Sequence, residues 1–425
     1  MLNIFGNANY TKADIAGIVL VATIWGERLL YYVRSVLLRL PIIGNFAEPF
    51  IVVTIVAVII ITLRWVKDRI RLQDLLFVFV VLSVYLLHLA IYEENAEYLS
   101  ENFPHFITVC LPMYLLGVVC DIDKCINVLV KVSLAYVFLG VLYYYYVTFV
   151  VGTYEMDATV DQMGLAYQYL PHVLLLIYAT IKKFNVWYFA GILLGVFMIL
   201  GSGNRGSLLL VFVFTAVVFL FWSKGNIFVK TLTLPLFLIL IISSDSIAIF
   251  FSDIMDDFGL SARSLNYFLE GEIADDNGRS RISKILVSAI WNSPIIGYGL
   301  AGDRIFLDDL YSHNLLLELL MSFGIPVGFA VFAAICLLLV RSFYKCQTSV
   351  QKAFYFVLLC CGFLQLFLSN TFLFEKTFYF LLGYCVMILR TYDNYLSKEV
   401  SNEESEYALH SSDSTVASCV MPEQR

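Results

Sequence analysis

Charged side chains are scarce in this sequence. Only 14% of its 425 residues are Asp, Glu, Lys or Arg, whereas 60% are hydrophobic. An average soluble domain carries about 25% charged residues. With only 14%, this chain could not cover its surface with enough polar groups to stay dissolved in water. The composition therefore excludes a soluble globular protein and predicts a chain that uses lipid as its solvent.

Excess positive charge and paired cysteines are also lacking. The chain has 27 Lys and Arg against 34 Asp and Glu, a formal net charge of −7, which argues against nucleic acid as a partner. None of the nine cysteines lies in the one long polar loop, residues 244–312. This placement excludes a disulfide framework in the loop and a paired CxxC zinc site, and we expect no metal or other cofactor.

Long hydrophobic runs fill most of the chain. A membrane-spanning helix needs about 20 apolar residues. We predict an all-α polytopic membrane protein with about twelve transmembrane helices. The predicted spans are residues 14–33, 46–63, 73–91, 105–120, 128–150, 164–181, 185–201, 206–222, 226–243, 314–340, 352–371 and 374–391. The first is the weakest because Glu27 and Arg28 interrupt it, and a shorter span followed by an interfacial stretch is the alternative.

Basic residues in the short loops predict the orientation. If the spans alternate, the loops that carry Arg64–Arg71, Lys182-Lys183 and Arg341–Lys352 fall on one face, which is then cytoplasmic together with both termini. The chain divides into spans one to nine (1–243), a large extracytoplasmic loop (244–312), spans ten to twelve (313–391) and a tail (392–425). The tail is rich in Ser and Glu from about residue 396, a composition typical of disorder.

The long loop contains a predicted helix. An apolar stripe at helical spacing runs through residues 281–291, with Ile282, Ile285, Leu286, Ala289 and Ile290 on one side. We expect an amphipathic helix that lies on the membrane surface.

Two arginine-bearing turns are candidates for binding an anion. Gly203-Asn204-Arg205-Gly206 is a tight turn at the outer end of two spans, and Gly278-Arg279-Ser280-Arg281 precedes the amphipathic helix. Guanidinium groups at a helix start suit phosphate oxygens. The ordinary alternatives are an interfacial anchor for Arg205 and charge balance in an acidic loop for Arg279 and Arg281.

His313 is the candidate catalytic base. It lies where the loop meets the membrane, and a histidine can take a proton near neutral pH. Asn314 and Glu318 lie one helical turn apart on the same face of the helix that follows. A carboxylate one turn inside the membrane is costly and is a functional-site candidate for that reason. A lone histidine at this place would ordinarily be an interfacial hydrogen-bonding residue.

The order of these motifs resembles the O-antigen polymerase and O-antigen ligase superfamily of bacterial envelope enzymes. That family has a Gly-Ser-rich turn ending in Arg, then a large outer loop with GR, NPxxGxG and HNxxLExxxxxG. Here the counterparts are Gly203–Gly206, Gly278-Arg279, Asn292–Gly299 and His313–Gly324. Ser293 stands where the family has Asn. The motifs cover about residues 201–328, and their order and spacing are more specific than any one of them.

The resemblance implies a GT-C-like glycosyltransferase of the polyprenol-using, many-helix type in the bacterial cytoplasmic (inner) membrane, with its active site facing outward. Its substrate would be an oligosaccharide on undecaprenyl diphosphate, and it would use no cofactor. Arg205 and Arg279, with Arg281 as a second choice, would bind diphosphate. His313 would act as base, supported by Asn314 and Glu318. Membrane lipid, a chain-length regulator and a flippase are the partners that the resemblance suggests.

The sequence leaves three functions open. A polymerase of O-antigen or capsular repeat units is the first interpretation, and a ligase that transfers the finished glycan to a lipid core is the second. A polysaccharide flippase or other transporter is the alternative from a different class. Transporters often show internal repeats and polar sites at the midplane, whereas this sequence shows no repeat and gathers its candidate charges at one face.

The loop charges predict the topology directly. A reporter enzyme that is active only outside the cytoplasm should be active when it is fused at about residue 270 and inactive at about residue 348, because the basic loop is retained in the cytoplasm. An extracytoplasmic signal at 348 would contradict the orientation.

Overall fold

A computed structural model describes residues 11–27, 64–146, 162–202, 204–221, 279–307 and 310–416, with isolated positions at 29, 32, 58, 61 and 62. Within these residues every regular element is helical. The α-helices are α1 (Lys12–Trp25), α4 (Leu72–Ile91), α5 (Glu93–His105), α6 (Leu111–Val119), α7 (Ile122–Tyr146), α9 (Gln162–Lys182), α10 (Val186–Gly201), α11 (Arg205–Phe221), α15 (Arg279–Asn292), α16 (Leu315–Lys345), α17 (Ser349–Leu358) and α18 (Lys376–Val416). Short 3₁₀ or π segments are η1 (Lys67–Arg69), η2 (Phe106–Cys110), η5 (Arg304–Phe306), η6 (Leu359–Phe363) and η7 (Leu364–Phe367).

The helices confirm a polytopic membrane protein. Among the described residues, six helices are long and apolar enough to cross a membrane, and two shorter apolar helices accompany them. The six are Leu72–Ile91, Glu93–Val119, Ile122–Tyr145, Gly164–Lys182, Leu315–Lys345 and Ser349–Phe367, and the shorter two are Val186–Leu200 and Gly206–Phe219. The predicted span 226–243 and nearly all of 46–63 lie outside the described residues.

α1 covers the first part of the predicted 14–33 span. It is 14 residues long, ends at Trp25 and has Gly26 as its C-cap. At 1.5 Å per residue it covers about 21 Å, less than the roughly 30 Å apolar core of a bilayer. Glu27, Leu29 and Tyr32 beyond the cap are again helical, and the other residues from 28 to 33 lie outside the described part of the chain, so the full span stays a prediction.

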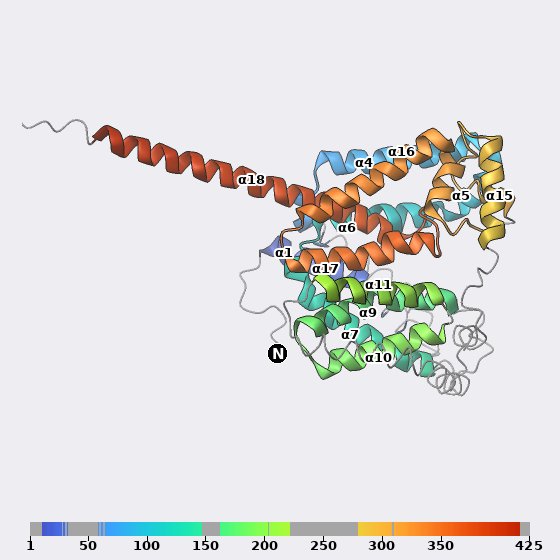
Figure 1. The fold of residues 1–425 in the computed structure, drawn as a ribbon, viewed down its shortest axis with the longest axis horizontal. Helices are drawn as coiled ribbons and strands as arrows, with labels where there is room; N and C mark the ends of the chain where they lie inside the picture. Colours follow the sequence, from blue (N-terminus) through green and yellow to red (C-terminus); the bar gives the residue numbers. More distant parts are fainter. Residues whose placement is uncertain are drawn as a thin grey trace, which may run out of the picture.

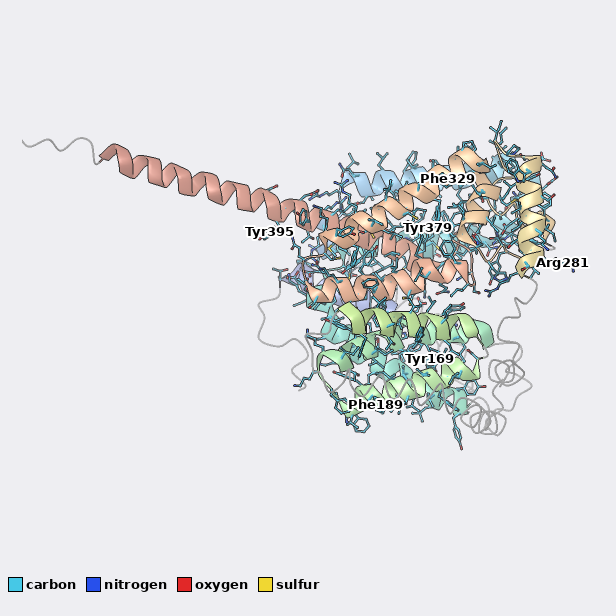
Figure 2. The ribbon with its side chains drawn as sticks, in the orientation of Figure 1. Tyr169, Phe189, Arg281, Phe329, Tyr379 and Tyr395 are labelled. Carbon is cyan, nitrogen blue, oxygen red and sulfur yellow. The ribbon has the colours of Figure 1, made fainter. Side chains whose placement is uncertain are left out.

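The outer faces of the bundle are apolar. Figure 2 shows Tyr169 and Tyr379 inside the bundle and Phe189 and Phe329 on its outside. Phe329 is 59% exposed and Phe189 41%, with many Leu and Val side chains of α4, α10 and α16 exposed in the same way. An apolar surface on this scale suits contact with lipid tails, because water would make it costly.

Small residues allow the central helices to approach closely. Gly117 of α6 and Gly383 of α18 face one another: a Cβ at Gly383 would contact the carbonyl oxygen of Tyr114, and one at Gly117 would contact that of Phe380. Glycine at such a crossing brings two backbones together, which is a common means of packing helices in membranes. The α6–α18 pair forms one wall of the site described below.

α15 lies across the ends of the long helices, at the right of Figure 1. Its apolar stripe packs onto the protein, since Leu286, Ala289 and Ile290 are buried against Leu307 and Met321. The stripe therefore does not face lipid as the sequence suggested. The apolar groups left exposed are instead at the C-terminal end of the helix, where Trp291 is 68% exposed.

α16 contains a break that receives the preceding loop. Gly324 has φ 74° and ψ 175°, so the helix is interrupted there and its carbonyl groups are free to bond elsewhere. The loop fills this opening: Tyr298 N–H donates to the Met321 carbonyl (2.7 Å) and Ile325 N–H donates to the Pro294 carbonyl (2.7 Å). The PxxGxG sequence and Gly324 are thus two halves of one backbone pairing.

The opposite end of the bundle carries the Asp121-Ile122-Asp123 sequence. Asp123 accepts hydrogen bonds from Thr348 Oγ1 (2.7 Å) and Gln351 Nε2 (2.9 Å), which joins the start of α7 to the start of α17. From this end α18 projects away from the bundle to Val416 (Figure 1). The described helix continues past residue 396, and the predicted disorder of the tail stays a prediction.

Replacing Gly324 should be destabilising. A Cβ in Gly324→Ala would contact the carbonyl group of Ile295, and φ 74° is unfavourable for alanine. We expect a loss of about 2–4 kcal/mol, measured as a lower melting temperature in detergent. Gly17→Ala in α1 is the control, because the nearest atoms to a Cβ there are 3.8 Å away. Equal melting temperatures for the two variants would contradict the pairing.

Candidate functional site

A large cavity opens among α1, α7, α9, α17 and α18, with the starts of α11 and α15 at its rim. Its volume is about 1080 Å³. It is larger than the usual range for small-molecule pockets, roughly 300–1,000 Å³. The walls are mostly apolar, but polar side chains gather in two places: at the rim, beside α15 and the 311–313 segment, and deeper, at the start of α18.

The rim brings together two of the segments that the sequence singled out. Arg279 lines the cavity, and its Nη2 donates to the Leu368 carbonyl (2.7 Å). α11 begins at Arg205, and both of its neighbours, Asn204 and Gly206, also line the cavity. The side chain of Arg205 lies outside the described atoms. The rim thus brings Arg279 close to the two chain neighbours of Arg205, and a shared anion site of the two arginines stays a prediction.

His313 lines the same cavity. It has φ 50°, an uncommon conformation for a residue other than glycine, and its ring lies 4.2 Å from that of Tyr311. Tyr311 is held in turn by a 3.2 Å contact between its hydroxyl and Ser369 Oγ. Nδ1 of His313 is buried and has no hydrogen-bond partner among the described residues. One nitrogen of a held imidazole is therefore left without a partner.

The electrostatic surroundings keep His313 neutral. Burial and the positive charges of Arg279 and Arg304 lower the pKa of His313 below its usual value, against an opposing effect of Asp303. A neutral imidazole is the form that can accept a proton.

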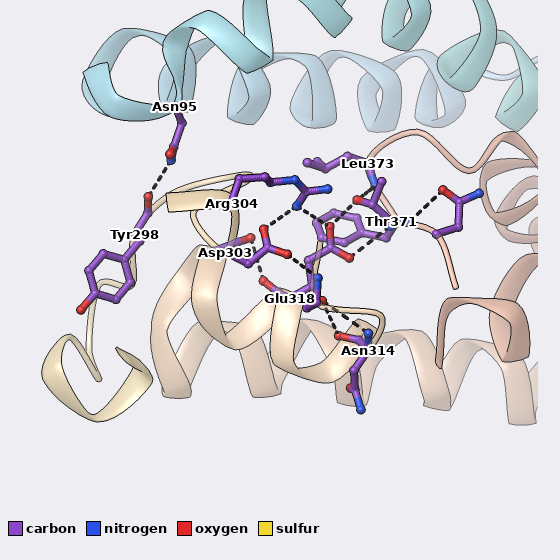
Figure 3. Close-up of polar contacts among 12 residues, drawn as sticks. Asn95, Tyr298, Asp303, Arg304, Asn314, Glu318, Thr371 and Leu373 are labelled. Carbon is purple, nitrogen blue, oxygen red and sulfur yellow. Dashed lines mark hydrogen bonds and ion pairs between the residues drawn. The ribbon is translucent and has the colours of Figure 1, made fainter. Parts of the chain in front are cut away.

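Asp303, Arg304 and Glu318 form a buried charge cluster (Figure 3). Arg304 is 4% exposed and pairs with Asp303 and with Glu318, whose Oε1 is 3.4 Å from Nη1. The guanidinium also stands over the ring of Tyr98, at 5.0 Å. Although burial works against the charged form, the carboxylates of Asp303 and Glu318 raise the pKa of Arg304 above its usual value. Arg304 therefore stays charged in a nearly dry environment.

This cluster fixes the backbone around the histidine. Asp303 Oδ2 accepts the N–H of Ser312 (2.8 Å), one residue before His313. Glu318 accepts from the Thr371 hydroxyl and from the N–H of Phe372 (3.3 Å), in the segment that follows Ser369. The charged groups thus tie together the two loops that form the rim.

Three predicted site residues do not line the cavity. Glu318 is 1% exposed and is bound into the cluster around Arg304. Asn314 is the N-cap of α16, with its Oδ1 accepting from the N–H groups of Leu316 (3.0 Å) and Leu317 (3.2 Å). Arg281 is exposed on α15 (Figure 2). Arg279 and His313 line the cavity and these three do not, and the catalytic or binding roles of all the predicted site residues stay predictions.

Sequence reasoning missed the deeper polar group. Glu27 pairs with Lys376, and both line the cavity together with Glu375. The available signal was the presence of charged residues inside otherwise apolar runs, which is costly unless they face a cavity. Arg304 was missed because a single Asp-Arg dipeptide in an acidic loop has no pattern that separates it from its neighbours.

A sequence profile of the O-antigen ligase family matches residues 190–333. This range contains most of α10, the Arg205 turn, α15, His313 and the break in α16, and it confirms the resemblance drawn from the motifs. No curated protein matches the chain in the corresponding search.

Removing Arg304 should destabilise the site. Arg304→Gln would leave Asp303 and Glu318 as two buried carboxylates without a counter-charge, a change that costs about 3–5 kcal/mol when a buried pair is broken. We expect a lower melting temperature in detergent and faster proteolysis of the 299–313 loop. Arg281→Gln, on an exposed side chain, should change neither. A melting temperature that is equal in both variants would show that the cluster contributes little.

Proposed function

Because residues 190–333 match the O-antigen ligase family, we propose that this multi-pass membrane protein is a polymerase of undecaprenyl-diphosphate-linked repeat units in O-antigen or capsular polysaccharide biosynthesis. It would have about twelve spans in a GT-C-like arrangement. It would act in the bacterial inner membrane, with the cavity rim facing outward. Its partners would be the lipid-linked oligosaccharide and membrane lipid, with a chain-length regulator and a flippase.

One observation carries the proposal: a guanidinium and a neutral imidazole share the rim of one large cavity. Arg279 can stabilise the negative charge that develops on a departing diphosphate. Its planar guanidinium can donate two parallel hydrogen bonds to two phosphate oxygens. His313 can accept the proton of an attacking hydroxyl. A leaving-group site beside a base is what glycosyl transfer from a lipid diphosphate needs.

The transfer would proceed in one displacement. The oxygen of an acceptor sugar hydroxyl attacks the anomeric carbon of the donor sugar, and the bond from that carbon to the diphosphate oxygen breaks. The leaving diphosphate takes the bonding electron pair, and His313 takes the hydroxyl proton. Attack from the face opposite the leaving group inverts the anomeric configuration.

A ligase that transfers glycan to a lipid core is the second candidate, because the matched family carries that description. A flippase or transporter is the third candidate. It is less well supported, because transport of a glycan needs no proton acceptor such as the proposed base His313. A cell-free reaction distinguishes them. With lipid-linked repeat units as the sole substrate, a polymerase gives a ladder of products, a ligase needs added lipid core, and a transporter forms no new bond.

Lysine should not substitute functionally for Arg205 or Arg279. Arg205→Lys and Arg279→Lys keep the charge but lose the paired geometry of the guanidinium, so each should reduce polymer formation about tenfold or more in the cell-free reaction. Protein abundance in the membrane, measured by immunoblot, should be unchanged. Full activity in both variants would mean that neither arginine recognises diphosphate through that geometry.

His313 should be required as a base. A positioned base contributes roughly 10²–10⁴ in rate, so His313→Ala should leave single repeat units on the carrier and no ladder. His313→Gln should fail in the same way, because an amide cannot take the proton. If His313→Gln assembled chains at nearly the normal rate, the histidine would be at most an orienting group.

The same residue predicts a pH dependence. Since the pKa of His313 lies below its usual value of 6.5, the base stays neutral at pH 7 and is lost only as the pH falls through the lowered pKa. Initial rates at donor concentrations well below KM report the free enzyme, so they should hold down to pH 6.5 and decline below it. A midpoint clearly above 6.5 would contradict the assignment of this limb to His313.

A further inference from the structure

The inner part of the cavity is a second polar site, distinct from the rim. We define the inner chamber by Glu27, Lys376, Glu375 and Gln365, and Asn370, in the rim segment after Ser369, connects the chamber to the rim; all five residues line the cavity. No motif of the sequence points to these residues, and the steps proposed above do not use them.

The chamber lies well inside the bundle. Trp25, the last residue of α1, donates from Nε1 to Ser133 Oγ (3.0 Å) and packs on His172, near the middle of α9. α18 also begins at depth, since a Cβ at Gly362, within η6, would lie 2.7 Å from the Thr377 carbonyl oxygen. The chamber is therefore an interior extension of the cavity.

Charged side chains in the interior of a membrane bundle are costly, so their presence in the inner chamber calls for an explanation. Glu27 and Lys376 form an ion pair with side chains 27% and 31% exposed, so both reach the cavity. Glu375 is 8% exposed and accepts from Asn370 Nδ2, from Gln365 Nε2 (3.4 Å) and from the N–H of Thr377 (2.9 Å). Ionisable residues within a membrane bundle are expensive and usually serve a substrate path.

We propose that the inner chamber is a binding subsite for sugar hydroxyl groups, a proposal that rests on the proposed function and deepens it. Carboxylates and carboxamides offer the acceptors and donors that neighbouring hydroxyls need, and Trp25 and Tyr136 add aromatic faces to the same wall. A polyprenyl chain is the poorer occupant, because it would remove water from these charges without replacing its hydrogen bonds. A sugar replaces them.

Two sources could supply those hydroxyls: the donor sugar on the lipid diphosphate or the end of an acceptor chain. The probe is the repeat-unit oligosaccharide released from the source cells' own polysaccharide, free of lipid and phosphate. Its binding to the purified full-length protein in detergent is measured by calorimetry. If a labelled sample of this oligosaccharide also appears in the polymer, the chamber holds the acceptor; if it inhibits without incorporation, the chamber holds donor sugars.

The decisive variant is the double substitution Glu27→Gln, Lys376→Met. It removes both charges together, so neither is left unpaired in the bundle, and the melting temperature verifies folding. We expect about tenfold weaker binding of the free oligosaccharide, the size of one lost charge-assisted hydrogen bond. Undecaprenyl diphosphate without sugar should bind as tightly as to the unsubstituted protein. Glu101→Gln, at an exposed carboxylate on α5 that does not line the cavity, is the matched control and should bind both probes normally.

Three results would overturn the subsite. They are no binding of the free oligosaccharide by the unsubstituted protein at millimolar concentration, equal binding by the double variant, and a loss confined to undecaprenyl diphosphate, which would place the lipid in the chamber. Each is separable from a failure of the polymerase proposal, which appears as the absence of a ladder while oligosaccharide binding persists.

Discussion

The site depends on one buried guanidinium. Arg304 stands between Asp303 and Glu318, and these two carboxylates in turn hold the N–H of Ser312 and the segment at Thr371. Desolvating three charges is costly, and their mutual attraction offsets that cost, although Nε and Nη2 of Arg304 are buried without a hydrogen-bond partner among the described residues. The arrangement is therefore intolerant of rearrangement. It fixes two loops that have no regular secondary structure of their own, and those loops carry His313 and Ser369 to the cavity.

A second constraint comes from the membrane itself, where an interrupted helix must find partners for its backbone groups. At Gly324 the partners are supplied by residues 294–299, whose N–H and carbonyl groups bond to those freed in α16. α4 and α5 brace the same loop, because His88 Nδ1 accepts from the Leu300 N–H (2.9 Å) and Asn95 donates to the Tyr298 carbonyl (2.8 Å). The glycine-rich motif is thus explained by packing, before any chemistry is assigned to it.

Much of this could be predicted from the sequence, and the rest could not for identifiable reasons. Hydrophobic runs locate the long helices because length and apolarity decide membrane insertion. Motif order places Arg279 and His313 near each other. The sequence did not reveal that Glu318 turns away from the cavity. Its position on the same helical face as Asn314 is compatible both with a role in the site and with the ion pair to Arg304. It also gave no sign of Lys376 as a partner of Glu27, since that contact joins residues 349 positions apart (376 − 27).

Arg279 acts on two groups at once in the proposed reaction. Its positive charge, with burial, keeps the pKa of His313 low while the cavity holds no substrate, so the imidazole is neutral and ready. A bound diphosphate would bring negative charge to the same guanidinium and offset its effect on the ring. The pKa of His313 would then rise, and the imidazole would become a stronger base only when a donor is in place. Coupling the base to the leaving group in this way favours proton removal when the anomeric carbon can be attacked, and limits it when the rim is empty.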